Sequence, residues 1–324
     1  MSGGKIGRAQ IYRDWRQVPD VARACVIAIG NFDGVHRGHQ AVLGQARRLA
    51  EARGVPLAAL VFEPHPRQYF QPDAPHFRLT PLATKAWLLA RYGVSVIYAL
   101  PFDHDMAERS AQSFLSEVLR DGLGAKHLVV GPDFQFGKGR EGTTETLTTF
   151  CEANGLGATV LAPVGEGEFA KISSTAIREL LEAGDPAAAA RLMGHWWSVV
   201  GMVEKGDQRG RTIGFPTANV SLRGYLQPAL GVYAVKVEIA GTLHGGVANF
   251  GRRPTFDKTD VLLEVHVFDF QGDLYGQEIV VSFVGYLRPE RKFAGLEELK
   301  AQIATDAQAA RELLSHSVLS TPGG

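Results

Sequence analysis

Short apolar runs alternate with amphipathic stretches in the first half of the chain. The runs are continuous and rich in β-branched residues, which is typical of strands buried on both faces. Between them apolar residues recur at three- and four-residue spacing, as from Val42 to Ala50, which indicates helices. This alternation predicts a doubly wound α/β domain whose ligands bind at the carboxyl ends of its strands. We place the strands at Val26–Ile29, Leu57–Phe62, Val94–Leu100, His127–Val130 and Ala158–Leu161.

The pattern changes after Trp197 to short strands separated by glycine turns. Many short strands without helices between them predict a small barrel or sandwich. Two short helices, Thr175–Ala183 and Pro186–Met193, precede this part, and a longer amphipathic helix from Leu296 to Leu314 closes the chain. We therefore expect two domains, residues 1–185 and 186–324. The expected strands are Ser198–Val203, Gly231–Ile239, Gly245–Asn249, Val261–Phe270 and Glu278–Tyr286.

Composition excludes several classes of protein. The 324 residues include 34 Lys and Arg and 34 Asp and Glu, and this balance argues against a broad basic face for nucleic acid. Only two cysteines occur, Cys25 and Cys151, which excludes a disulfide scaffold and suits a reducing compartment. No apolar run approaches the roughly 18 residues of a membrane helix, and Met1–Trp15 lacks the apolar core of a signal peptide. We expect a cytoplasmic protein without nucleic-acid or membrane partners.

Between the first expected strand and the first helix lies the glycine-rich segment Gly30–His39. A helix that starts after a strand offers backbone N–H groups to an anion, and glycines allow the backbone to approach it closely. His36 and His39 are three residues apart, so both can donate hydrogen bonds to phosphate oxygens. A metal site is the rival interpretation, but the sequence offers no third ligand at matching spacing. The segment therefore predicts phosphate binding.

A second segment, Lys171–Arg178, follows the last expected strand of the α/β domain and begins a helix. Its Ser and Thr residues suit helix capping, and Arg178 lies one turn inside the helix, where it can reach an anion at the cap. Taken alone, this is the pattern of an ordinary capped helix. Together with His36 and His39 it predicts a second phosphate clamp.

In the second half, the segment Gly206–Asn219 combines three glycines with two arginines. Its Thr217 and Asn219 offer neutral oxygens, which suit a hard ion such as Mg²⁺. Phosphoryl transfer needs a loop that binds the phosphates, positive charge and a metal-binding site. A β-hairpin that happens to carry arginines is the alternative, but Pro216 and the glycines favour a functional loop.

Glu264 interrupts the apolar strand Val261–Phe270 and shares a face with His266 and Phe268. An acidic residue at such a position is either a buried, hydrogen-bonded carboxylate or a general base for a substrate hydroxyl. The sequence does not separate these two roles.

Taken together, these residues resemble the bacterial bifunctional riboflavin kinase/FAD synthetase family over residues 28–311. The resemblance implies a Rossmann-like nucleotidyltransferase domain followed by a Greek-key β-barrel kinase domain with a C-terminal helix. Gly30–His39 resembles the nucleotidyltransferase signature, and Gly210–Asn219 ends in the Pro-Thr-Ala-Asn core of flavokinases. The other matching segments are Ile172–Arg178, Leu263–His266, Asp273–Gly276 and Leu287–Phe293.

The family implies two reactions with riboflavin, FMN and ATP as small-molecule substrates and Mg²⁺ as cofactor. In the barrel, ATP phosphorylates the ribityl hydroxyl of riboflavin to give FMN and ADP. In the α/β domain, the FMN phosphate attacks the α-phosphate of ATP to give FAD and pyrophosphate. Positioning and electrostatics carry both steps, without a covalent enzyme intermediate.

The resemblance also assigns residues to roles. It gives catalytic roles to Glu264, His36 and His39, and metal binding to Thr217 and Asn219. Flavin binding falls to Pro64, Asp133, Arg288 and Phe293. The ATP- and phosphate-binding residues are Gly30, Phe32, Asp33, Gly34, Gly38, Ser173, Ser174, Thr175, Arg178, Gly206, Arg209, Gly210, Arg211, Gly214, Pro216, Thr217 and Asn219.

One position departs from the family pattern. Many members carry Asp or Asn after the glycine that corresponds to Gly142, whereas Thr143 and Thr144 stand here, so the contacts of this loop with flavin or adenine stay open. Two alternatives to the two-step enzyme also stand. One is a nucleotidyltransferase for another phosphorylated small molecule; the other makes the barrel a regulatory or nucleic-acid-binding module, which the neutral charge balance disfavours.

Overall fold

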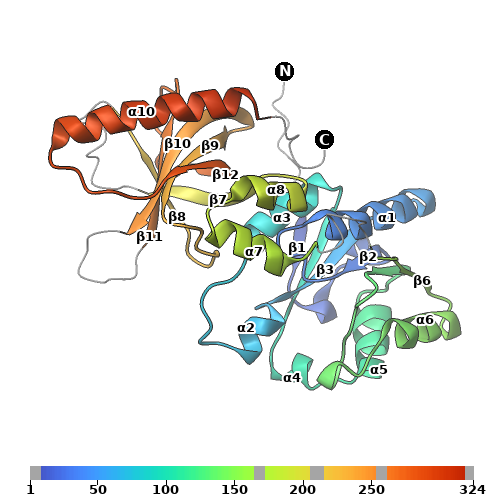
Figure 1. The fold of residues 1–324 in the computed structure, drawn as a ribbon. Helices are drawn as coiled ribbons and strands as arrows, with labels where there is room; N and C mark the ends of the chain where they lie inside the picture. Colours follow the sequence, from blue (N-terminus) through green and yellow to red (C-terminus); the bar gives the residue numbers. More distant parts are fainter. Residues whose placement is uncertain (1–8, 164–171, 205–214, 253–260, 318–324) are drawn as a thin grey trace. The chain divides into compact units, whose positions relative to one another are not determined.

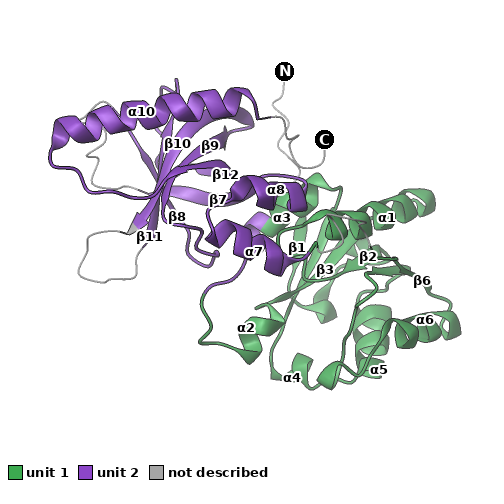
Figure 2. Cartoon of the chain, in the orientation of Figure 1, with its two compact units in different colours: residues 1–75, 85–172, 323 green, residues 76–84, 173–322, 324 purple. Residues whose placement is uncertain are grey.

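The computed structural model describes residues 9–163, 172–204, 215–252 and 261–317. They divide into two compact units, one of residues 1–75 and 85–172 and the other of residues 76–84 and 173–322 (Figure 2). The first holds a parallel sheet with helices, and the second a closed barrel and the C-terminal helix (Figure 1). This confirms the predicted fold class. The predicted boundary between the two functional domains, at residue 185, is not tested by this division and stays a prediction.

The sheet of the first unit has six strands in the order β1-β4-β3-β2-β5-β6. The order reverses at β2, because the chain runs from β2 through β3 and β4 on one side and returns to β5 on the other. Ligands of open α/β sheets bind outside the strands' carboxyl ends at such a reversal. The strands are β1 Gln10–Tyr12, β2 Val26–Ile29, β3 Leu57–Glu63, β4 Val96–Pro101, β5 His127–Val130 and β6 Gly157–Val160.

Helices connect these strands, and several of them begin at side-chain caps. His36 Nδ1 accepts a hydrogen bond from His39 N at the start of α1, and Thr143 and Thr146 form a capping box at the start of α6. The helices are α1 Arg37–Arg53, α2 Pro66–Phe70, α3 Leu82–Arg91, α4 His104–Ala107, α5 Ala111–Ser113, α6 Thr144–Ala153, the π-helical η3 Phe114–Gly122 and the 3₁₀ turns η1 Trp15–Gln17, η2 Asp20–Ala22 and η4 Lys138–Arg140.

Both faces of the sheet are covered by helices, as its continuous apolar strands predict. Ile27 and Ile29 of β2 share a core cluster with Leu115 of η3. Side chains alternate along a strand, so the buried Val26 and Ala28 face the other side, where α1 packs. β2 is therefore buried on both faces, and only its carboxyl end is open to carry a site.

The second unit contains a closed antiparallel barrel in the order β10-β11-β8-β7-β12-β9. Closure removes the unpaired edges that an open antiparallel sheet would expose. The barrel strands are β7 Trp197–Glu204, β8 Ala218–Ser221, β9 Gly231–Ile239, β10 Thr242–Arg252, β11 Val261–Val267 and β12 Glu278–Arg288, and the helices are α7 Ser174–Glu182, α8 Pro186–Met193 and α10 Leu296–Ser315.

The barrel interior and the helix α10 form separate cores. Trp197, Phe250 and Phe283 lie among the buried residues that fill the barrel. Helix α10 packs outside, against β9, β10 and β12, where Ala310 and Phe268 are buried. The interior is thus filled by side chains, and a ligand of this unit must bind on its outer surface or at its ends.

Residues 76–84 belong to the second unit although they lie within the first half of the sequence. The fully buried Trp197 donates a hydrogen bond from Nε1 to Leu79 O at 2.9 Å. Leu226 N donates to Arg78 O at 2.7 Å. These contacts join the segment to the start of β7 and to the loop after β8.

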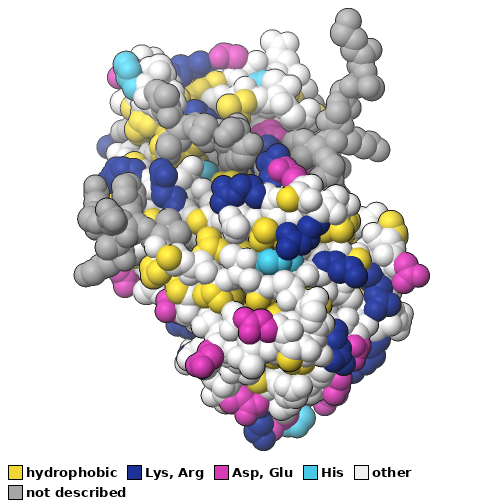
Figure 3. Space-filling view, turned by 90° about the vertical axis from the view of Figure 1, so that its right-hand side faces the viewer, with side chains coloured by type: hydrophobic (Ala, Val, Ile, Leu, Met, Phe, Trp, Pro, Cys, Tyr) yellow, Lys and Arg dark blue, Asp and Glu magenta, His cyan; other side chains and the backbone are white. Residues whose placement is uncertain are grey.

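The described helices and surface can be compared with those of proteins that bind membranes or nucleic acids. No described helix combines the length and apolar character needed to span a bilayer. On the face drawn in Figure 3, Lys and Arg side chains form small separate groups among acidic and apolar ones. The described residues of that face therefore form no continuous basic surface of the kind that binds nucleic acid.

The packing of Gly157 gives a stability prediction. A Cβ at this position would lie 1.9 Å from Nδ1 of the buried His127, whose Nε2 is 2.8 Å from Thr159 Oγ1. Because Gly157→Ala must displace that ring, we expect the free energy of unfolding to fall by about 1–3 kcal/mol in urea denaturation. Gly44, inside α1, has nothing within 4 Å of a Cβ placed there, so Gly44→Ala should raise it by about 0.5–1 kcal/mol. Equal effects of the two substitutions would contradict this packing.

Candidate active sites

The carboxyl end of β2 leads directly into the predicted phosphate loop. Gly30 N donates to Leu60 O of the neighbouring strand at 3.3 Å, and Val35 N closes a turn on Phe32 O at 3.3 Å. The turn needs positive φ at Gly34 (82°) but also at Phe32 (46°) and Val35 (41°). Positive φ at non-glycine residues costs energy, and such strain is found where a site must hold a fixed shape.

Side chains of the loop point inward and pack on each other. Phe32 and Asp33 are buried, at 1% and 2% exposure. The Phe32 ring also covers Gly30, where a Cβ would lie 3.4 Å from it. A Cβ at Gly38 would lie 3.2 Å from the His36 ring. Both glycines therefore let aromatic rings approach the backbone, in the loop after β2 and the first turn of α1.

His36 and His39 form a stacked pair at the start of α1. Their ring centroids are 3.7 Å apart with an angle of 17° between the planes. His39 Nδ1 is buried without a hydrogen-bond partner among the described residues. Burial, and then the positive charges of His36 and Lys85, hold the pKa of His39 well below its usual range. His39 is thus a neutral ring, and in the tautomer that carries the proton on Nδ1 this atom can donate a hydrogen bond to an anion.

An aromatic cluster at the carboxyl ends of β3 and β4 was not predicted from the sequence. The Phe102 ring lies 5.4 Å from Phe62, 5.4 Å from Tyr69 and 5.8 Å from Phe70. Phe70 is 66% exposed, which is unusual for a large apolar side chain. Rings gathered beside a phosphate loop suit a flat aromatic ligand. Phenylalanines at the carboxyl ends of two neighbouring parallel strands are the sequence signal from which the cluster could have been predicted.

Two predicted flavin residues of the first unit are exposed near strand ends. Pro64 follows β3 through a cis peptide bond, and Asp133 follows β5. Thr143, which departs from the family pattern, caps α6 by accepting a hydrogen bond from Thr146 N at 3.3 Å. This local role accounts for a hydroxyl at position 143, and no described contact gives Thr144 a comparable one.

The predicted second phosphate clamp lies in the second unit. Ser173 Oγ caps α7 by accepting from Ala176 N at 3.2 Å, and Ser174 and Thr175 form the first turn. Arg178 Nε donates to Phe77 O at 2.7 Å, with its guanidinium 5.2 Å from the Phe77 ring centroid. Because these residues and the histidine pair belong to different units, their joint action on one nucleotide stays a prediction.

The outer face of the barrel carries a row of polar side chains. Leu263 and Val265 lie in the barrel core, so Glu264 between them points outward. Register places Glu264 opposite Asn219 of β8 on one side and opposite Asn249 of β10 on the other. Strand pairing thus brings together two predicted kinase residues and one that the sequence analysis missed. Asn249 lies between the core residues Ala248 and Phe250, and this alternation is the signal for it.

The end of the Pro-Thr-Ala-Asn segment is anchored beside this row. His266 donates from Nδ1 to Pro216 O at 2.9 Å, and Thr217 and Asn219 follow Pro216. Asn219 is buried at 6% exposure, and its Oδ1 has no hydrogen-bond partner among the described residues. The predicted cradle residues Gly206, Arg209, Gly210, Arg211 and Gly214 lie outside the described residues and stay predictions.

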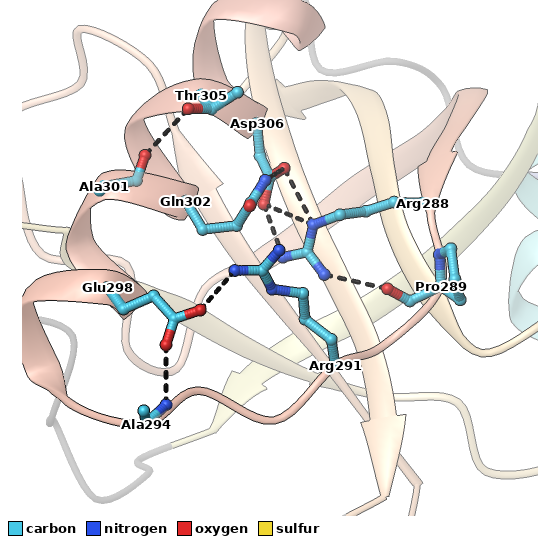
Figure 4. A network of polar contacts seen from close by, with 9 residues as sticks. All are labelled: Arg288, Pro289, Arg291, Ala294, Glu298, Ala301, Gln302, Thr305 and Asp306. Carbon is cyan, nitrogen blue, oxygen red and sulfur yellow. Dashed lines mark hydrogen bonds and ion pairs between the residues drawn. The ribbon is translucent and has the colours of Figure 1, made fainter.

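The last two predicted flavin residues lie together at the end of β12, where Figure 4 shows a polar network. The guanidinium carbon of Arg288 is 5.7 Å and that of Arg291 is 4.7 Å from the Phe293 ring centroid. Arg288 Nη2 donates to Asp306 of α10 at 2.7 Å, and its Nη1 donates to Pro289 O at 2.9 Å (Figure 4). Arg288 is thus fixed by α10, and it holds the segment that carries Phe293.

Two family models match the sequence in chain order. The model described as FAD synthetase matches residues 18–176, and the model described as riboflavin kinase matches residues 193–314. The first range includes the loop after β2, and the second includes the whole barrel.

Curated relatives and a solved structure match nearly the whole chain. Bifunctional riboflavin kinase/FMN adenylyltransferases of Escherichia coli K12 and Pseudomonas fluorescens are 45% and 41% identical over 289 and 309 residues, which are 89% and 95% of this chain and 92% and 99% of theirs. A crystal structure described as a macrolide-efflux protein from Streptococcus pneumoniae has a TM-score of 0.80 at 31% identity, covering 94% of this chain and 99% of that one. The chain therefore belongs to the family of bifunctional riboflavin kinase/FMN adenylyltransferases.

Proposed function

We propose that the chain converts riboflavin to FMN and FMN to FAD, with ATP as the second substrate of both steps. The observation that carries the proposal is the barrel register that sets Glu264 opposite Asn219, in a chain that matches both family models. A carboxylate beside an amide with an unused oxygen provides a base and a metal ligand in one place.

In the kinase step, the ribityl hydroxyl of riboflavin attacks the γ-phosphorus of ATP, and ADP leaves. Glu264 takes the hydroxyl proton, and its outward position on the barrel lets substrate reach it. Thr217, Asn219 and the cradle between Gly206 and Gly214 would hold the ATP phosphates. Asn249, directly opposite Glu264, would orient the carboxylate.

Enzymes of this family use ATP, generally with a divalent metal, and we propose Mg²⁺ for this chain. The buried Oδ1 of Asn219, which has no hydrogen-bond partner within the described ranges, and the hydroxyl of Thr217 are hard oxygen donors and fit that ion. No group of three or more His, Cys, Asp or Glu side chains is arranged for a metal among the described residues. Mg²⁺ usually binds through one or two protein oxygens together with substrate phosphates, so this sparse set suits it.

In the adenylyl step, an oxygen of the FMN phosphate attacks the α-phosphorus of ATP, and pyrophosphate leaves. His36 and His39 donate hydrogen bonds to the charge that builds on the phosphates, while the loop Gly30–Gly38 binds them through its backbone. Ser173 to Arg178 would contribute the second clamp. The aromatic cluster of Phe62, Phe102 and Tyr69, next to Pro64, would receive the isoalloxazine ring.

We place this activity in the cytoplasm. Cys25 and Cys151 are free thiols and fully buried, which suits a reducing compartment, where riboflavin, FMN and ATP are available.

A direct assay tests the proposed function. Purified protein with riboflavin, ATP and Mg²⁺ should form FMN first and FAD with pyrophosphate afterwards, resolved by reversed-phase chromatography. Chelation of Mg²⁺ with EDTA should stop both steps, because the phosphates lose their counter-charge. FMN without FAD would remove the synthetase assignment, and absence of FMN would remove the kinase assignment.

Single substitutions should separate the two sites. Glu264→Gln removes the base, so riboflavin phosphorylation should fall by about 10²–10⁴-fold, while supplied FMN is still converted to FAD. His36→Ala removes one phosphate donor, so FAD formation should fall by about 10²–10³-fold with the kinase intact. Each variant is the control for the other, and loss of both activities in a folded variant would disprove the assignment of separate sites.

The depressed pKa of His39 predicts a pH dependence of stability. In the unfolded chain this histidine gains a proton near its usual pKa of about 6.5, whereas in the folded protein it stays neutral to a much lower pH. The unfolded state therefore binds more protons in that window, and stability must fall as pH falls. From pH 7.5 to 5, wild type should lose more unfolding free energy than His39→Gln, by up to about 1.4 kcal/mol per pH unit. His316→Gln, at an exposed position, is the matched control. Equal slopes of unfolding free energy against pH for wild type and His39→Gln would contradict a neutral His39.

A further inference from the structure

Lys85 is a buried cation below the phosphate loop. It lies on α3, in the part that belongs to the first unit, and only 3% of it is exposed. Its Nζ donates a hydrogen bond to Asn31 O at 2.6 Å. Lysine is almost never fully buried without a specific role, because its charge must be removed from water. The role of Lys85 is therefore to be sought in the loop that it contacts.

The loop needs an external support. Phe32 and Val35 hold positive φ values of 46° and 41°, which non-glycine residues keep only when their surroundings impose them. Asn31 lies directly before Phe32, at the point where the chain leaves β2 and turns. A hydrogen bond to Asn31 O from a charged donor is stronger than one from a neutral donor. Lys85 thus fixes the entry to the strained turn.

Lys85 also acts on the histidine pair through its charge. Together with burial and the neighbouring His36, its positive charge lowers the pKa of His39. The same charge contributes to the potential at His39 Nδ1, which has no hydrogen-bond partner among the described residues. An anion that binds at this atom gains from the same charge.

The other charged groups of this region do not replace Lys85. Asp33, in the same loop, is buried and acidic. Helix α1 packs on β2, β3 and β5, and β2 has no titratable side chain. Glu63 ends β3, and His127 stands at the first position of β5, the opposite end from the loop. Among these groups, Lys85 supplies positive charge from a separate helix.

We propose that Lys85 is a positioning residue for adenylyl transfer, which holds the turn from Asn31 to Gly34 against the histidine pair and adds fixed positive charge where the ATP phosphates bind. This inference rests on the proposed function of the loop. Lys85 acts on the substrate through the loop and through its field, so it is not assigned a direct contact with ATP.

The test compares Lys85→Met, Lys85→Arg and the exposed Lys126→Met as a matched control in the full-length protein. With FMN and ATP supplied, Lys85→Met should lower kcat for FAD formation by about 10–100-fold, because electrostatic stabilisation of the transition state weakens. The KM for FMN should change less than about threefold, and riboflavin phosphorylation should stay at the wild-type rate. Lys85→Arg keeps the charge and should recover a large part of kcat, and Lys126→Met should behave as wild type.

A readout without nucleotide separates this inference from the proposed function. In His-selective NMR titrations, with His39 assigned by His39→Gln, removal of the Lys85 charge should raise the pKa of His39 in the free protein. A packing role alone would leave that pKa unmoved while lowering stability.

An unchanged kcat and an unchanged His39 titration in Lys85→Met would overturn the proposal, and so would an equal loss of both activities. If Lys85→Met does not fold, Lys85→Arg provides the test. A folded Lys85→Arg protein that keeps neither the wild-type kcat nor the low pKa of His39 would also overturn the proposal. Wild-type protein that forms FMN but no FAD would instead overturn the proposed synthetase and this inference with it.

Discussion

Strand pairing determines where the functional side chains of both units lie. In the first unit, β2 pairs with β3 on one side and with β5 on the other, so the strand order reverses at β2. The site is expected at the carboxyl end of this strand. The loop Gly30–His39 begins at that end of β2, where ligands of such sheets bind. In the second unit, antiparallel pairing of β11 with β8 sets Glu264 beside Asn219. A shift of one residue would turn Glu264 into the apolar interior, so the register is specified by the core itself.

The sequence predicted most of the fold because its strongest signals are local. The strands β2, β5 and β9 and the helix α8 have the predicted bounds, since each is a compact apolar run or a capped amphipathic stretch. Two short strands were missed, β1 with three residues and β8 with four, because polar residues interrupt both and neither is a continuous apolar run like β2 or β5. The membership of residues 76–84 in the second unit rests on contacts with Trp197 and Leu226. Such distant contacts leave no periodic pattern in a sequence.

The candidate sites were predicted where the residues lie within one motif, and missed where the fold assembles them. The loop from Gly30 to His39 is continuous, so its glycines and histidines could be found together. Phe62, Phe102 and Tyr69 come from three separate segments, and only the parallel order of β3 and β4 brings their rings together. Lys85 belongs to no motif that the sequence analysis identified. Its hydrogen bond to Asn31 O depends on how α3 crosses the loop, which no local pattern states.

The two proposed reactions differ in what they ask of the protein, and this accounts for the different side chains at the two proposed sites. The riboflavin hydroxyl must lose a proton, so the barrel offers the carboxylate of Glu264, half-buried and flanked by the neutral amides Asn219 and Asn249. The FMN phosphate is already ionised near pH 7 and needs no base. Its site instead has to draw two anions together, which histidine rings, backbone N–H groups and the charge of Lys85 can do. Each proposed site therefore carries the groups that suit its own step: a base for the hydroxyl in the barrel, and hydrogen-bond donors and positive charge for the phosphates in the α/β unit. A formal net charge of zero over the chain is the sum of these local differences and conceals them.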